Sequence, residues 1–318
     1  MTVLQPLPVA QDDPPVSLWR DAWSRLRRNR MALVSLGIIA ILAFAAIFGP
    51  SLTPYDFLSQ DLGARNLSPS LAHFFGTDEL GRDVFSRVVY GTRTAFIVAI
   101  VVTTIAATLG IVLGACAGYF GGAFDRFIMW FTDMTMSVPQ LLLVLVINAS
   151  LKPPLARFME EQYMLTQNPF FRNSVIVDFV LVFGSMALIS WPGYARLIRA
   201  QVLSIRNRPY VTAARALGLD TPIIIMRYVI PNAIGPLIVA ISAGLGAAMV
   251  LESAFSFLGV GVNPPTPSWG NMISDGLQVW RNYPHLLAAP AIVLGIATIA
   301  FSFLGDGLND ALNPRGSK

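Results

Sequence analysis

Residues that could carry out catalysis or bind a metal are few in this sequence. His73 and His285 stand far apart, and neither belongs to a His-Glu-x-x-His or comparable ligand spacing. Cys116 is the only cysteine, so no intrachain disulfide can form, and its apolar neighbours favour a structural role. No Gly-x-Ser-x-Gly motif presents a nucleophilic serine. The sequence therefore predicts neither a catalytic site nor a metal site.

The lysines give no support to nucleotide binding either. A phosphate-binding loop needs Gly-x-x-x-x-Gly-Lys-[Ser/Thr], because its lysine reaches the terminal phosphates. The chain has only Lys152, which follows Leu151, and Lys318, the last residue. We therefore expect this chain itself to bind no ATP and no other cofactor.

The segments of the chain that carry these few reactive residues are mostly apolar. Hydrophobic residues make up 54% of the chain and charged residues 13%, and the mean hydropathy is +0.61, whereas about 25% of an average soluble domain is charged. A helix needs about 20 apolar residues to cross a bilayer. Six runs qualify, and they predict an all-α polytopic membrane protein: 31–48, 94–118, 127–149, 175–192, 233–251 and 286–304.

Two of the apolar stretches are interrupted. Residues 253–274 contain Gly-Val-Gly-Val-Asn-Pro-Pro-Thr-Pro, which cannot maintain a helix, so a loop is expected there, with a partly re-entrant path as an alternative. Asp133 and Pro139 fall within the third run. An ionisable group at membrane depth usually faces protein or water, so Asp133 is either an interfacial carboxylate with a partner or part of a translocation path.

The basic residues predict topology. With the N-terminus inside, fourteen of the twenty-two lysines and arginines fall on inner segments, and they form no solvated basic face for nucleic acid. We expect cytoplasmic termini, a cytoplasmic tail over residues 1–30 and one transmembrane domain over 31–318. Outer loops are expected at about 49–93, 150–174 and 252–285. A cleavable signal peptide is not expected, because the first apolar run begins only at Met31.

Small residues recur at four-residue spacing on two of the expected helices. Gly110, Gly114 and Gly118 form one such stripe, and Ala240, Gly244 and Ala248 form another. In lipid the hydrophobic effect does not drive helices together, so their association depends on close packing of their backbones. Both stripes are therefore predicted to be surfaces of helix packing.

The inner segment 193–231 is the most organised loop of the chain. Residues 196–205 have helix-forming composition, 207–209 break the helix, and 210–217 resume a short helix that Gly218 would end. Asp220 and Pro222 then begin the next helix. A short helix with small Ala213 and Ala214 suits the groove of a partner, and the alternative is an amphipathic helix lying on the lipid surface.

This loop resembles the EAA loop of bacterial ABC-importer permeases. The family pattern is Glu-Ala-Ala, three residues, Gly, nine residues, then Ile-x-Leu-Pro. Here Thr212-Ala213-Ala214 is followed by Gly218 and, after nine residues, by Tyr228-Val229-Ile230-Pro231. Thr212 replaces the glutamate, and Tyr228 and Ile230 replace the Ile and Leu. Both alanines, the glycine, the proline and both spacings are kept.

Other segments are similar to the second permease subunit of dipeptide, oligopeptide and nickel importers. They are HFFGTDELGRDVFSRVVYGTRTA at 73–95, WPGYARLIRAQVLSIR at 191–206 and SFLGVGVNPPTPSWGNMI at 256–273. The resemblance covers nearly the whole chain. One departure is the outer segment 151–173, which is longer and more polar than usual in that family. It either alters contact with a substrate-delivering protein or is a solvated insertion.

The resemblance implies a type I ABC-importer permease fold in the bacterial cytoplasmic membrane. Its implied partners are a homologous permease, two cytoplasmic ATPase subunits that hold ATP and Mg²⁺, and an extracytoplasmic solute-binding protein. Peptides are the first candidate substrate and nickel complexes the second, because no His or Cys cluster favours metal. The residues implied to couple the chain to the ATPases are Tyr210, Thr212, Ala213, Ala214, Gly218 and Pro231.

Two further expectations complete this interpretation. Glu252, at the outer end of the fifth run, is expected to meet either the amino group of a peptide or an arginine of the partner permease. A secondary transporter driven by an ion gradient is the alternative function, and it would require acidic or broken helices near mid-membrane and an inverted repeat. A membrane-embedded hydrolase or synthase would need catalytic residues on the spans, which the sequence lacks.

Overall fold

The computed structural model describes residues 18–172 and 174–312, and its regular structure there is helical throughout. Six helices are long and apolar enough to cross a membrane, which confirms the predicted all-α, six-span architecture. Part of the expected cytoplasmic tail, residues 1–17, lies outside the described residues. So do Arg315 and Lys318 of the expected inner C-terminus.

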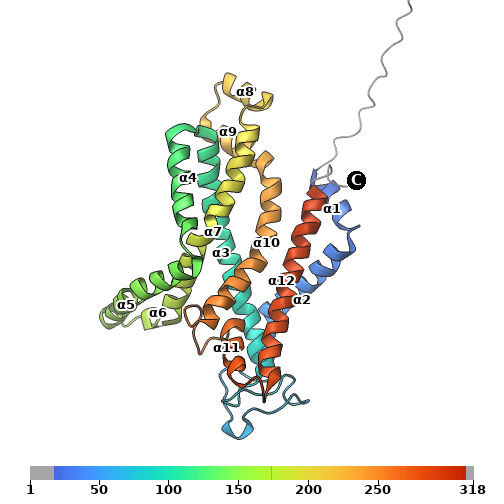
Figure 1. Ribbon diagram of the computed structural model, residues 1–318, viewed down its shortest axis with the longest axis vertical. Helices are drawn as coiled ribbons and strands as arrows, with labels where there is room; N and C mark the ends of the chain where they lie inside the picture. Colours follow the sequence, from blue (N-terminus) through green and yellow to red (C-terminus); the bar gives the residue numbers. More distant parts are fainter. Residues whose placement is uncertain (1–17, 173, 313–318) are drawn as a thin grey trace, which may run out of the picture.

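The long helices stand side by side, with short elements at both ends (Figure 1). Helices α8 and α9 lie at one end, and α11 lies at the other beside the irregular segment 53–83. The helix bounds are α1 Leu18–Leu26, α2 Arg30–Leu52, α3 Val84–Phe120, α4 Gly122–Ser137, α5 Gln140–Thr166, α6 Pro169–Arg172, α7 Ser174–Ile205, α8 Pro209–Ala216, α9 Thr221–Ile224, α10 Ile230–Phe257, α11 Trp269–Val279 and α12 Pro284–Leu312, with a π-helical turn at Ile225–Val229 before α10.

Polar side chains begin several of these helices. The carboxylate of Asp83 accepts a hydrogen bond from the Ser86 backbone N–H at 2.8 Å and so caps α3. Ser268 and Asn271 form a capping box at the start of α11. These caps explain why α3 begins at Val84 and α11 at Trp269, inside segments that the sequence analysis assigned to the outer loops 49–93 and 252–285.

The glycine stripe of α3 packs against α7, as predicted. A Cβ on Gly118 would lie 3.0 Å from the carbonyl oxygen of Arg199, and one on Gly110 would lie 2.9 Å from the backbone nitrogen of Ala195. Side chains at these positions would therefore separate the two helices. Close backbone approach makes α3 and α7 a tightly packed pair at the centre of the bundle.

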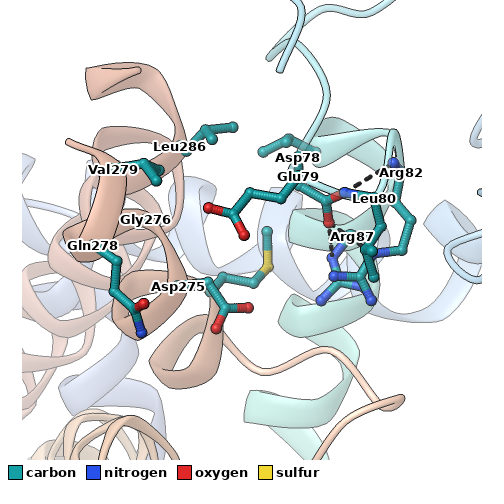
Figure 2. Close-up of a pocket in the computed structure, with 12 residues that line it drawn as sticks. Asp78, Glu79, Leu80, Arg82, Arg87, Asp275, Gly276, Gln278, Val279 and Leu286 are labelled. Atoms are coloured by element: carbon teal, nitrogen blue, oxygen red, sulfur yellow. Dashed lines mark hydrogen bonds and ion pairs between the residues drawn. The ribbon is translucent and has the colours of Figure 1, made fainter. Parts of the chain in front are cut away.

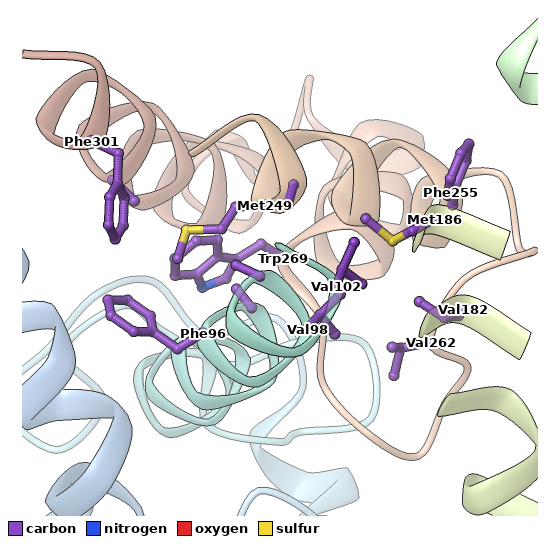
Figure 3. Close-up of a cluster of buried hydrophobic side chains, with 14 of the residues drawn as sticks. Phe96, Val98, Val102, Val182, Met186, Met249, Phe255, Val262, Trp269 and Phe301 are labelled. Carbon is purple, nitrogen blue, oxygen red and sulfur yellow. The ribbon is translucent and has the colours of Figure 1, made fainter. Parts of the chain in front are cut away.

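A buried cluster joins α3 and α7 to α10, α11 and α12 (Figure 3). Trp269 at the start of α11 is fully buried among Phe96, Met249 and Phe301. Its indole N–H donates to the Val88 carbonyl at 3.1 Å, so the ring is satisfied as well as packed. The short helix α11 is therefore part of the core, not of a mobile outer loop.

The third apolar run, 127–149, is not one helix. Helix α4 ends at Ser137, Val138 is extended, and α5 begins at Gln140. Pro139 causes the break, because a proline disfavours helical geometry in the residue before it. Helix α5 then continues to Thr166, so the segment 150–174, expected to be an outer loop, is largely helical. In Figure 1, α5 and α6 project to one side of the bundle, and α5 packs against the first part of α7.

Candidate coupling helix and translocation surface

Helix α8 runs over Pro209–Ala216, within one residue at each end of the predicted 210–217. Pro209 occupies its first turn, where the missing N–H costs nothing. After the last turn Gly218 takes φ +78°, and its N–H donates to the Arg215 carbonyl at 3.0 Å. The Leu219 N–H donates to the Ala214 carbonyl at 3.2 Å, which completes a Schellman motif. The predicted short helix and its glycine end are confirmed.

One face of α8 packs inward and the other is exposed. Val211 and Ala214 are buried in the cluster of α3, α7 and α10. Tyr210, Ala213 and Leu217 lie three and four residues apart on the exposed side, and Leu217 is 82% exposed. We call these three residues the tip surface. Ala214 faces the core of this chain, and its part in coupling to a partner stays a prediction.

Thr212 and Pro231 are the two remaining residues that the resemblance implies for coupling to the ATPases. The hydroxyl of Thr212 donates to the Pro209 carbonyl at 2.9 Å, within its own helix. Pro231 is exposed in the first turn of α10, separated from α8 by α9 and the π-helical turn. Neither residue belongs to the tip surface.

Arginines tie the loop around α8 to α3 and α4. The guanidinium of Arg215 donates to the Tyr119 hydroxyl at 3.2 Å and lies over its ring. Arg206 donates to the carbonyl of Gly118, the last glycine of the stripe, at 3.0 Å. On α7, Arg199 binds both carboxylate oxygens of Asp125 on α4, at 2.5 and 2.6 Å. From the sequence, these arginines indicated only which segments are cytoplasmic. Their contacts could not be predicted, because their partners lie 74 to 96 residues away.

Asp133 forms an ion pair with Arg196, and the contact joins α4 to α7. Both side chains are largely exposed in the isolated chain. This geometry fits the interpretation of Asp133 as an interfacial carboxylate with a partner, and the partner lies in the same chain. Its role in transport stays a prediction.

Glu252 is buried within this chain, and its contact with a peptide or a partner permease stays a prediction. The residue is 0% exposed, and its carboxylate accepts hydrogen bonds from the hydroxyls of Ser256 and Ser268 at 2.7 Å and of Ser253 at 3.3 Å. Ser268 is also the cap of α11. Glu252 therefore fastens the end of α10 to the start of α11.

A cavity of about 370 Å³ opens between α3, α7, α10 and the first residue of α5. Its polar lining comes from Thr103, Gln140, Ser190 and Tyr194. Its remaining wall is small or aliphatic: Val102, Gly193, Ala240, Gly244, Ala247, Ala248 and Leu251. The predicted packing stripe of α10 thus lines a cavity, and the Tyr194 hydroxyl lies against Gly244.

Comparisons with known proteins agree with this arrangement. Residues 110–318 match the family described as binding-protein-dependent transport system inner membrane component, and residues 17–69 match the N-terminal transmembrane domain of oligopeptide transport permease C. The chain is 37% identical to a dipeptide transport system permease protein of Bacillus subtilis, over 95% of this chain and 87% of the relative.

Two further relatives extend the comparison. An oligopeptide transport system permease protein of Bacillus subtilis is 34% identical, over 94% of this chain and 90% of its own length. A glutathione transport system permease protein of Salmonella typhimurium is also 34% identical, over 98% and 96%. With its six spans this is a multi-pass protein of the inner membrane. The chain belongs to the family of binding-protein-dependent transport system inner membrane components, and it is a permease subunit of an ABC importer, not an enzyme.

Proposed function

We propose that this chain is one of two permease subunits through which an ATP-driven importer moves di- or oligopeptides into the cytoplasm. The named relatives carry dipeptides, oligopeptides and glutathione, all of which are peptides. Nickel complexes, the second substrate class, have no observation in their favour. The ATPase and binding-protein partners follow from the family. The number of ATPase subunits, two, and the binding of ATP and Mg²⁺ on them alone are part of the proposal.

The observation that carries the proposal is the exposed tip surface on α8. A single exposed apolar residue is common on protein surfaces, but Tyr210, Ala213 and Leu217 share one exposed face at the end of the bundle, which is typical of a protein contact surface. Gly218 leaves the helix end without a side chain beside it. The tip surface therefore inserts into a groove of an ATPase subunit, in preference to lying on lipid.

The contacts around α8 connect a displacement of this helix to the membrane-spanning helices. A displacement of α8 acts on the end of α3 through Arg215 and Arg206, and the pairing of Arg199 with Asp125 then connects movement of α7 to α4. ATP binding closes the ATPase pair, and their different contacts with α8 in the two states bias the bundle between inward-open and outward-open forms.

The orientation is proposed with both termini in the cytoplasm. In Figure 1, α1 and the end of α12 lie in the same half of the molecule as α8. Five arginines cluster in and beside α1, all of them exposed: Arg20, Arg25, Arg27, Arg28 and Arg30. The positive-inside rule then supports a cytoplasmic α8, where an ATPase can reach it.

The cavity beside Tyr194 is the proposed solute surface of this subunit. Its hydroxyl and amide groups, from Tyr194, Ser190 and Gln140, suit the N–H and C=O groups of a peptide backbone. The small residues of α10 keep the space open. The second permease subunit would form the wall of this cavity that the present chain leaves open.

Uptake in proteoliposomes tests the proposal. The complex isolated with this chain is expected to accumulate a radiolabelled tripeptide only when ATP is inside and the copurifying binding protein is outside. Imposed proton and sodium gradients serve as the comparison. Uptake by this chain alone, driven by either gradient, would establish the secondary transporter instead.

A further inference from the structure

A second, charged cavity lies at the end of the molecule opposite α8. It has a volume of about 270 Å³ and is enclosed by the segment around Asp78, the first turn of α3, helix α11 and the start of α12 (Figure 2). The lining includes three carboxylates and two guanidinium groups. None of these residues belongs to the tip surface or to the cavity beside Tyr194.

Only some of the charged groups that line this cavity form ion pairs with one another. Arg82 binds the Asp78 carboxylate at 2.7 Å, and the Arg87 Nε lies 3.6 Å from the same carboxylate. Both arginines are thus directed at Asp78. Within residues 18–172 and 174–312, Glu79 and Asp275 form no ion pair. Figure 2 shows both carboxylates in the open space, one from each wall.

Arg87 adds an unsatisfied donor at the same place. Its side chain is 2% exposed, and its Nη1 is buried without a hydrogen-bond partner among the described residues. Buried donors of this kind are rare in native proteins, because an unpaired buried N–H loses the hydrogen bond that water gives it in the unfolded chain. An acceptor oxygen supplied from outside would replace that hydrogen bond.

The pKa of Asp275 is shifted by the burial and by the charges of the cavity. Partial burial raises this pKa, and the nearby carboxylates of Asp78 and Glu79 raise it further, while Arg87 and Arg82 act in the opposite direction. A cation placed beside Asp275 would stabilise its charged form. The cavity is therefore suited to a positive group, with a hydrogen-bond acceptor close behind it.

The size of the cavity restricts the occupant. Pockets for small-molecule ligands usually begin at about 300 Å³, and this cavity is smaller and already lined by long side chains. One inserted side chain fits it better than a peptide substrate does. The occupant is then a residue of a neighbouring protein.

We propose that this cavity receives a lysine or arginine side chain of the solute-binding protein, with its cation between Glu79 and Asp275. An oxygen acceptor from the same loop of the binding protein takes the free N–H of Arg87. The proposal rests on the proposed function, because that orientation puts the cavity on the extracytoplasmic side. The occupant follows from the unpaired carboxylates and from the position opposite the ATPase-binding end.

Stimulation of ATP hydrolysis by the binding protein tests this docking. The complex in nanodiscs is titrated with its binding protein, for the wild type and for the double variant Glu79→Gln/Asp275→Asn. The concentration for half-maximal stimulation is expected to rise roughly tenfold in the double variant, with an unchanged maximal rate. Asp306→Asn/Asp310→Asn, two exposed carboxylates near the end of α12 in the half of the molecule that holds α8, is the matched control and is expected to behave as wild type.

A double-mutant cycle identifies the partner residue. Exposed lysines and arginines of the binding protein are changed to alanine one at a time. One of them is expected to weaken docking to the wild type and to add nothing in the double variant. Half-saturation of the double variant within twofold of wild type would overturn the docking proposal alone. A wild-type complex that the binding protein never stimulates would overturn the proposed function, and the docking proposal with it.

Discussion

At Gly218 the backbone adopts φ +78°, and an added Cβ would meet no atom of this chain within 4 Å. A bulky residue there would strain the backbone by about 1–2 kcal/mol and would otherwise clash only with a docked partner. Gly218→Trp is therefore expected to insert normally but to lose at least tenfold in ATP-driven uptake. Gly218→Asn, which tolerates this conformation, is the control, and normal uptake by Gly218→Trp would contradict the assignment.

Glu252 is expected to govern stability. Removing its carboxylate leaves three serine hydroxyls without their acceptor in a buried site. Glu252→Ala should therefore lower the free energy of unfolding by at least about 2 kcal/mol, whereas Glu252→Gln keeps an acceptor oxygen and loses less. Thermal unfolding of the purified protein measures both. Equal melting temperatures for wild type and Glu252→Ala would refute this role.

Asp275 gives a prediction for pH dependence. Its pKa is raised on folding, so the folded chain binds the proton more tightly than the unfolded chain. The stabilising contribution is complete below the pKa of the unfolded carboxyl and is lost as pH rises through the higher folded pKa. Asp275→Asn should match the wild-type melting temperature in acid and exceed it at neutral pH, by no more than about 2 °C. A lower value at neutral pH would contradict this.

The sequence could predict some of these residues and not others. Gly218 stands at a fixed distance from Ala213 and Ala214, so the local pattern was enough. The burial of Glu252 could not be predicted, because it depends on Ser268, which is 16 residues away across an irregular segment with no periodic pattern. The helix pattern alone also did not tell which of the two adjacent alanines, Ala213 or Ala214, faces the core.

Helix α8 is the element that should bind the ATPase. Leu217→Glu places a charge on the tip surface without disturbing the buried face. Copurification of the ATPase subunit is expected to fall at least tenfold. Leu71→Glu is a matched control, because Leu71 is 94% exposed and lies in the segment at the opposite end. Equal losses from both variants would indicate general damage and not a docking surface.

Among the elements, the six spans were predictable because length and apolarity are enough to identify them. The division of the third run into α4 and α5 was harder. Pro139 signalled it, but the residues on both sides are apolar and favour one continuous span. The helix over 150–166 was missed because the segment is too polar to be recognised as a span and was expected to be an outer loop, although α5 continues through both Pro153 and Pro154.

The whole molecule has two ends with different chemistry. One carries the tip surface of α8 and the arginines around α1, and the other carries the acidic cavity beside α11. The fold follows from the hydrophobicity of the sequence, and the proposed orientation follows from the placement of its charges. Neither cavity could be predicted, because each is formed by helices that are distant in sequence.

Crosslinking of α8 tests the central claim most directly. Cys116→Ser removes the only cysteine of this chain, and Ala213→Cys then places one thiol on the tip surface. With a short thiol-to-amine crosslinker in transporting proteoliposomes, Ala213→Cys should join an ATPase subunit with a yield that changes when ATP is added, and Leu71→Cys should not. Absence of that crosslink while ATP-driven uptake continues would contradict the account.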